Sequence, residues 1–178
     1  MTKNHNTEKN ESLKRLHHSA AIGDLAGTWE YLEDLLEVAV LRLSGCADYR
    51  GRVLTERLGA RKTLGAIRRL VEHKYGPDVV AKGSVFRKLS DEINALYNHR
   101  NRIIHASWQA WKVSSNGSTA TYIKAASLQA PVVETVTTDE IKDYIARIAQ
   151  AHEDLLNFLI QQCEFVAWPG IYEWPQDQ

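Results

Sequence analysis

The stretch Leu96–Trp108, LYNHRNRIIHASW, raises the main question about this chain, because it places polar residues inside a hydrophobic repeat. From Phe86 to Ile104, apolar residues recur at steps of three and four, the pattern of an amphipathic helix. On an ideal helix, which turns ~100° per residue, Arg100 falls within ~40° of Phe86, in the middle of this stripe. A buried arginine without a partner destabilises a fold by several kcal/mol. Arg100 therefore needs a partner or a function.

Two further polar residues follow at helical spacing. Asn101 and His105 lie four residues apart on one flank of the stripe, so their side chains are close enough to meet across a turn. The long side chain of Arg100 can swing towards the same flank. His99 and Arg102 point away from the stripe on the same wheel, which favours a surface position. The sequence thus predicts that Arg100, Asn101 and His105 converge beside the stripe.

These residue types suit chemistry on a phosphodiester. Histidine has the ordinary pKa nearest neutrality, so it can take and give a proton near pH 7. Arginine stays charged and presents a planar donor fork that matches phosphate oxygens. With a ribose 2′-hydroxyl as internal nucleophile, neither a metal nor a covalent enzyme intermediate is required. No residue cluster offers three or four metal ligands, and no cofactor is expected.

The segment Arg100–His105, RNRIIH, resembles RNxxxH, a form of the Rx4-6H motif that marks HEPN domains, and the following ASW resembles the continuation in many small bacterial members. The resemblance covers the architecture of residues 20–162. It implies a helical bundle, a homodimer formed through the motif helix, and metal-independent RNA cleavage in the composite cleft. Carried onto this chain, it makes His105 the proton-transfer residue, Arg100 the phosphate ligand and Asn101 the residue that orients either.

The resemblance also implies roles for neighbouring residues and for partners. His99, Arg102, Tyr97 and Trp108 become candidate substrate-binding residues, the two aromatic ones by stacking on bases. The expected cleavage products are a 2′,3′-cyclic phosphate and a 5′-hydroxyl. Many small active members are toxins or phage-defence effectors, and some are held in check by a nucleotidyltransferase-like antitoxin protein. RNA, a second copy of the chain and an antitoxin are therefore the expected partners.

Two other interpretations remain open from the sequence. In the first, the domain keeps the HEPN architecture but only binds RNA, nucleotides or a protein, because a fold does not determine its function. In the second, the protein is an unrelated helical protein. Arg100 then pairs with Asp34 or Glu37 of the first helix, and His105 caps a helix end.

The rest of the chain predicts a mainly α fold: an up-down bundle of four to five helices with a β-hairpin inserted before the last long helix. The first helix ends at Ser44 and Gly45, and a second runs over residues 60–73 until YGPD stops it. The third starts at an N-cap, Ser84, and the last follows a capping box formed by Thr137 and Glu140 and runs to about Gln162. The inward-facing residues of the first and last helices are Ile22, Leu25, Trp29, Leu32, Leu36, Val40, Leu43, Ile141, Tyr144, Ile145, Ile148, Leu155 and Leu159.

The domain organisation follows from composition. Residues 1–18 are polar and expected to be frayed or weakly helical, and residues 19–165 form the single domain. Strands at about 108–114 and 119–126 flank Asn116-Gly117, a dipeptide that favours a tight hairpin turn. Residues 166–178 form an aromatic, proline-containing tail.

Charge, cysteine content and the lack of a long apolar stretch limit the classes of protein to which this chain can belong. The formal net charge is +0, which argues against a strongly basic DNA-binding protein, yet residues 50–74 carry a local net charge of +6 and residues 139–178 one of −6. The two cysteines, Cys46 and Cys163, are expected to be small buried side chains, not a disulfide. No signal peptide or membrane-spanning stretch is evident, so a cytoplasmic location without membrane association is expected.

Overall fold

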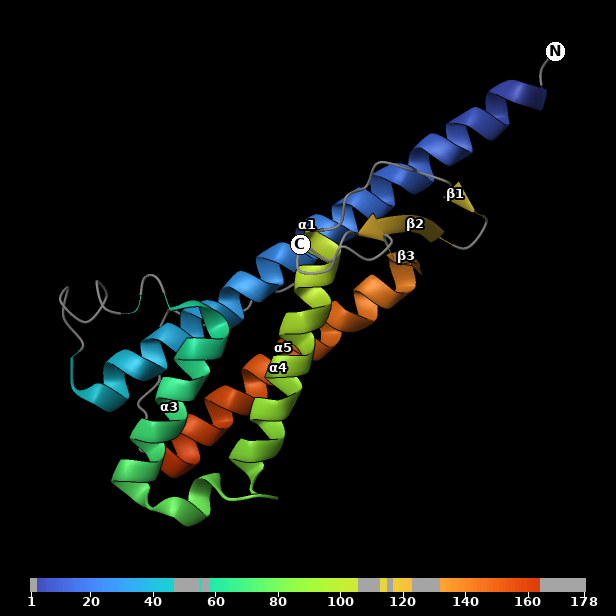
Figure 1. Cartoon of the computed structure of the whole chain (residues 1–178). Coiled ribbons are helices and arrows are strands. Elements are labelled where there is room, and N and C mark those ends of the chain that lie inside the picture. The colour runs from blue at the N-terminus through green and yellow to red at the C-terminus, as the bar shows by residue number, and fades with distance from the viewer. Residues whose placement is uncertain are drawn as a thin grey trace. The chain divides into compact units, whose positions relative to one another are not determined.

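The described part of the protein is mainly helical, as the sequence predicts. The structure is a computed structural model that describes residues 3–46, 55, 58–105, 113–114, 117–122 and 132–163. Its helices are α1 (Lys3–Ser44), α3 (Gly59–Tyr75), the short 3-10 helix η1 (Pro77–Val80), α4 (Val85–Ile104) and α5 (Thr138–Cys163) (Figure 1). The described helices include none that is both long and apolar enough to cross a membrane.

Local sequence signals set the helix ends. α1 stops at Gly45, whose φ of 72° is in the region that favours glycine, and the N–H of Cys46 donates to the Leu41 carbonyl. The Ser84 hydroxyl accepts the Arg87 N–H at 3.1 Å, which confirms the predicted cap of α4. The predicted capping box before α5 is also confirmed. The Glu140 N–H donates to Thr137 Oγ1 at 3.0 Å, and the Thr137 N–H donates to Glu140 Oε2 at 2.7 Å.

Contacts divide the chain into two compact units, and the first comprises residues 1–32 and 92–150. In it, Trp29 of α1 packs against Tyr97 of α4, with ring centroids 5.9 Å apart. The Nδ1 atom of His18 lies 3.0 Å from the Thr138 hydroxyl at the start of α5. The side chains that fill this core are Leu25, Trp29, Leu32, Ile93, Leu96, Ile103, Ile141 and Ile148, all nearly inaccessible to solvent. They include Ile93, Leu96 and Ile103 of the apolar stripe predicted for α4.

The second unit comprises residues 33–91 and 151–178. Phe86 of α4 and Phe158 of α5 meet at a centroid distance of 5.3 Å. The Tyr75 hydroxyl donates to the Cys163 carbonyl at 2.9 Å, which ties the end of α3 to the end of α5. Its buried side chains come from every helical segment of the unit: Leu35, Leu36, Ala39, Val40, Ala60, Leu64, Ile67, Val71, Val80, Phe86, Leu89, Leu155, Phe158 and Leu159.

The region between α4 and α5 differs from the predicted hairpin. It contains β1 (Val113–Ser114), β2 (Gly117–Tyr122) and β3 (Val132–Val136) in an antiparallel sheet of order β1-β2-β3. The most extensive pairing joins β2 to β3, from Ser118 opposite Val136 to Tyr122 opposite Val132. The prediction had no strand at β3, although VVETV is rich in the β-branched residues that favour strands.

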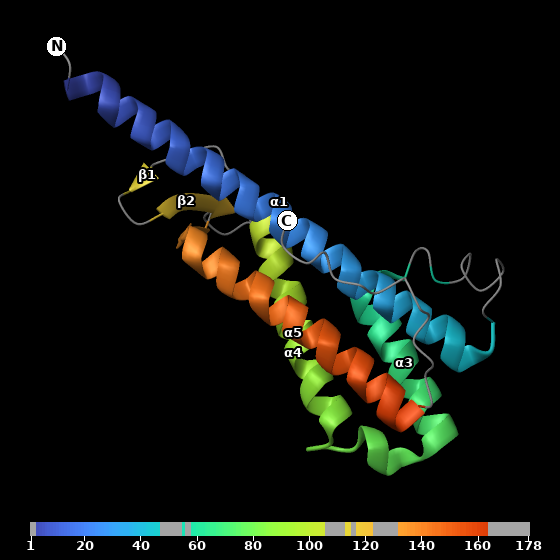
Figure 2. The same cartoon turned by 180° about the vertical axis from the view of Figure 1, so that it is seen from behind.

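Two other predictions are corrected. The segment 1–18 was expected to be frayed or only weakly helical, yet from Lys3 onwards it belongs to α1, which continues without a break to Ser44 (Figure 2). Residues 8–17 of this segment are all exposed and form no continuous hydrophobic face. A search for helical periodicity of apolar residues therefore could not predict this part of the helix. Cys46 was expected to be buried, but it is exposed just beyond the end of α1, whereas Cys163 is buried as predicted. The aromatic tail at residues 166–178 lies outside the described residues.

Candidate functional site

The predicted site lies at the C-terminal end of α4. The buried side chains of this helix, Phe86, Leu89, Ile93, Leu96 and Ile103, occupy an arc of ~100° on the helical wheel, and Arg100 falls inside that arc. Arg100 is half-buried there, as are Asn101 and Arg102. α4 therefore places Arg100 on the arc of its buried side chains, as the helical wheel predicts, but the residue is only half-buried there.

Asn101 holds the Arg100 guanidinium. Arg100 Nη1 donates to Asn101 Oδ1 at 3.1 Å. The Nε atom of Arg100 is buried and has no hydrogen-bond acceptor within the described residues. A buried donor without an acceptor lowers stability, since it has lost its hydrogen bonds to water. Asn101 thus restrains one edge of the guanidinium, while its Nε donor is not satisfied by the described part of the fold.

His105 lies immediately after the last residue of α4. Its N–H donates to the Asn101 carbonyl at 3.0 Å, which continues the helical hydrogen-bond pattern by one residue. Its side chain is exposed. Asn101 and His105 are therefore joined through the backbone, and the Asn101 side chain is directed to Arg100. The sequence left open whether Asn101 orients the histidine or the arginine, and among the described contacts it holds the arginine.

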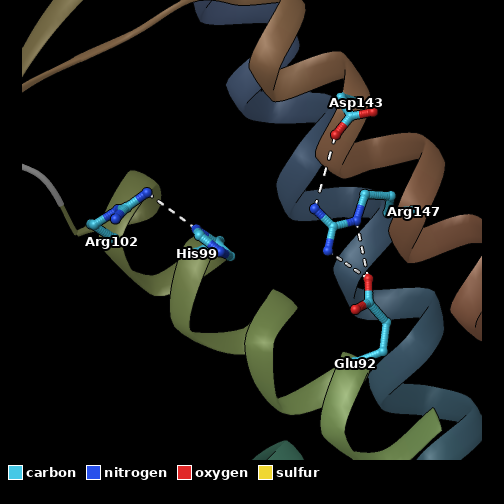
Figure 3. A network of polar contacts seen from close by, with 5 residues as sticks. All are labelled: Glu92, His99, Arg102, Asp143 and Arg147. Atoms are coloured by element: carbon cyan, nitrogen blue, oxygen red, sulfur yellow. Dashed lines mark hydrogen bonds and ion pairs between the residues drawn. The ribbon is translucent and has the colours of Figure 1, made fainter. Parts of the chain in front are cut away.

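His99 and Arg102 occupy the other flank of α4. The sequence favoured a surface position for both, but His99 is half-buried and stacks on Tyr144 of α5, with ring centroids 4.7 Å apart and planes 22° apart. Arg102 Nη2 lies 3.1 Å from His99 Nδ1 (Figure 3). Because a guanidinium can only donate, Nδ1 accepts, and the proton of a neutral His99 ring is then on Nε2. The helical wheel gave the wrong environment for His99, because a wheel of α4 alone cannot show that α5 covers this flank.

A charged network continues along the interface of α4 and α5. Arg147 of α5 donates to Glu92 Oε1 from Nε at 3.0 Å and from Nη2 at 2.7 Å, and its Nη1 lies 4.0 Å from Asp143 (Figure 3). The hydrogen bonds that Arg147 donates to the Glu92 carboxylate raise the pKa of Arg147 above its ordinary value. The Arg147 guanidinium also lies 5.7 Å from the Tyr144 ring centroid.

Sequence reasoning missed the pairing of these residues. Glu92 and His99 are seven residues apart on α4, and Tyr144 and Arg147 are three apart on α5, so each pair shares a helix face. This spacing is the available signal, but it does not say which face of one helix meets which face of the other.

Of the two candidate aromatic residues, Tyr97 packs on Trp29, and Trp108 lies outside the described residues.

Three buried titratable groups lie away from this cluster. Burial lowers the pKa of His18 and of His152, and for His152 the nearby Glu153 opposes the shift. Burial raises the pKa of Cys163 to about 11, although Lys74 acts in the opposite direction. Within the described ranges, no three His, Cys, Asp or Glu side chains are grouped so that they could hold a metal ion.

The arrangement on α4 can hold an anion and move a proton. A restrained guanidinium and an exposed imidazole lie within two turns of one helix, and Asn101 connects them through its side chain and its carbonyl. On the other flank, His99 instead packs against Tyr144 of α5, and Arg102 contacts His99. Comparison with known protein families, characterised proteins and solved structures finds no match to this chain.

Proposed function

We propose that the protein is a metal-independent endoribonuclease of the HEPN type, with Arg100, Asn101 and His105 as its catalytic residues. The observation that carries the proposal is that the end of α4 carries both an exposed His105 and an Arg100 whose Nη1 donates to Asn101 and whose Nε has no acceptor among the described residues. An exposed histidine can reach a substrate, and a guanidinium with unused donors can bind a phosphate.

The reaction follows from the chemistry of RNA. The 2′-oxygen attacks the adjacent phosphorus and loses its proton, the bond from phosphorus to the 5′-oxygen breaks, and that oxygen gains a proton. His105 takes the first proton or supplies the second. In the proposed homodimer, the His105 of a second copy is available for the other transfer. Arg100 offsets the charge that develops on the phosphoryl oxygens.

The test is a cleavage assay with total RNA and tRNA in excess EDTA. Wild type, His105→Ala and His17→Ala are compared after purification to the same standard, because His17 is also exposed and lies on α1, outside the proposed site. Wild type and His17→Ala should cut RNA and leave 2′,3′-cyclic phosphate ends, whereas His105→Ala should leave it intact. Equal cleavage by His105→Ala, with its fold confirmed by circular dichroism, would rule out the assigned role.

The assay also distinguishes the alternative functions. A wild-type homodimer that binds RNA without cutting it would favour a binding module. An Arg100→Ala variant with a sharply lower melting temperature and no change in any RNA would favour a purely structural role. If the protein is a toxin or a phage-defence effector, expression of wild type should arrest growth, expression of His105→Ala should not, and co-expression of an antitoxin should relieve the arrest.

A further inference from the structure

α3 carries a group of exposed basic side chains around one small residue. Arg61, Lys62, Arg68 and Arg69 are all exposed. They stand four and three residues before Gly65 and three and four residues after it, which are the positions that neighbour Gly65 on a helix surface. We call these five residues the Gly65 basic face. Ala60, Thr63, Leu64, Ile67 and Val71 form the opposite, buried face of α3.

Packing among the described residues does not explain the glycine at the centre. A Cβ atom built on Gly65 would meet no heavy atom within 4 Å among the described residues, and the backbone there is ordinary right-handed helix. Glycine lowers the stability of a helix interior relative to alanine. The missing side chain leaves the helix backbone open to close approach from outside, between two pairs of cations.

The charges themselves also work against the stability of α3. Arg61 and Lys62 lie in its first turn, where the helix dipole disfavours positive charge. That turn contains no acidic residue of its own, and the acid that reaches it is Glu33 of α1, whose Oε1 accepts the Ala60 N–H at 3.3 Å. On the exposed arc shared by the four basic residues, Glu72 is the one acidic side chain of α3. A ligand of opposite charge would offset these unfavourable terms.

We propose that the Gly65 basic face binds the phosphate backbone of RNA, independently of base sequence. Arg61 and Arg68 are separated by about 10 Å along the helix axis, on the scale of two or three consecutive phosphates of one strand. Arginine forks can grip phosphate oxygens on both sides of Gly65, while the bare backbone lets the strand lie close. The choice of RNA as ligand rests on the proposed function, and the binding surface is distinct from the α4 residues.

The test measures binding in the His105→Ala background, so that cleavage does not interfere. A fluorescent single-stranded RNA is titrated at several salt concentrations with three proteins: the parent, Arg68→Gln/Arg69→Gln, and Lys14→Gln/Arg15→Gln. The last is the matched control, an exposed basic pair on α1 with the same change in net charge. The α3 variant should bind about tenfold more weakly, and its log Kd against log salt slope should fall by about 1.4, for two lost phosphate contacts. The control should stay within about twofold of the parent.

A second variant tests the close approach to the helix. Gly65→Ala should fold at least as stably as the parent, because its Cβ meets open space, and Gly65→Gln should bind RNA more weakly than Gly65→Ala. If the α3 double variant binds RNA as tightly as the α1 control, the proposal is wrong. Stronger competition by polyglutamate than by RNA of equal charge would also overturn it, since the face would then fit an acidic protein. Neither result depends on cleavage, so a failed nuclease assay leaves this test decisive.

Discussion

Arg147 of α5 donates two hydrogen bonds to one carboxylate oxygen of Glu92 of α4, from Nε at 3.0 Å and from Nη2 at 2.7 Å. The pair joins the first half of α4 to α5. Two turns along α4 from Glu92 and one turn along α5 from Arg147, His99 and Tyr144 stack and continue the same interface. The candidate residues on α4 are thus supported from one side by α5.

The ion pair should contribute modestly to stability. Both side chains are about 40% exposed, so solvent screens the attraction. A double-mutant cycle with Glu92→Gln and Arg147→Met should give a coupling free energy of about 0.5 kcal/mol, which decreases at high salt. Urea unfolding of the four proteins measures it. A coupling energy well above 1 kcal/mol would show that the pair is more strongly desolvated than the structure indicates.

Replacing Arg100 should stabilise the fold while removing its proposed activity. Arg100→Met keeps the aliphatic stem and removes a buried Nε that has no acceptor in the described residues, so the free energy of unfolding should rise by about 1 kcal/mol. Arg15→Met, an exposed change on α1, should alter it little. Chemical denaturation and the RNA assay are run side by side. Destabilisation by Arg100→Met would instead support the interpretation in which an ion pair anchors Arg100.

α1 offers a paired test of the core. The Trp29 side chain is 0% exposed and that of Tyr31, two residues on, is 46% exposed. Trp29→Ala should lower the free energy of unfolding by about 3 to 5 kcal/mol, because it leaves a cavity between α1 and α4. Tyr31→Ala should lower it by less than about 0.5 kcal/mol. Thermal or urea unfolding followed by circular dichroism distinguishes them, and similar losses in both variants would contradict the assigned burial.

Acid should weaken the fold through His18. Burial lowers its pKa from the ordinary 6.5, so the unfolded chain takes up a proton more readily than the folded one. This contribution to stability is complete above pH 6.5 and decreases as the pH falls below that value. His18→Gln, which can still accept from the Thr138 hydroxyl, should make stability less dependent on pH between about 5 and 7.5. The exposed neighbour variant His17→Gln should retain the wild-type dependence. His152, also buried, should leave part of the dependence in His18→Gln.

The features that could be predicted from sequence are those determined locally. The Ser84 cap, the Thr137–Glu140 box, the glycine after α1 and the stripe of α4 each depend on residues within a few positions of one another. The position of Arg100 on the buried arc of α4 follows from the same periodicity. Capping signals and helical periodicity were therefore enough to predict where these helices begin or end and which face of α4 is buried.

Features created by contacts between distant segments could not be predicted. His99 looks like a surface residue on the wheel of α4 alone and becomes half-buried because Tyr144 covers it. The pairing of β3 with β2 joins residues about ten to twenty positions apart along the chain, which no short pattern specifies. Cys46 follows a helix with a buried apolar face yet is exposed, because α1 ends at Gly45 and the exposed turn there leaves Cys46 outside that face.

The two cysteines differ enough to serve as a built-in labelling system. Cys46 is exposed at the end of α1, while Cys163 is buried with a pKa of about 11, so its reactive thiolate is scarce at neutral pH. A maleimide dye or spin label added to the unmodified protein near pH 7 will therefore attach to Cys46 first. Conjugation at this single position gives spectroscopy a reporter on α1 without any engineered substitution.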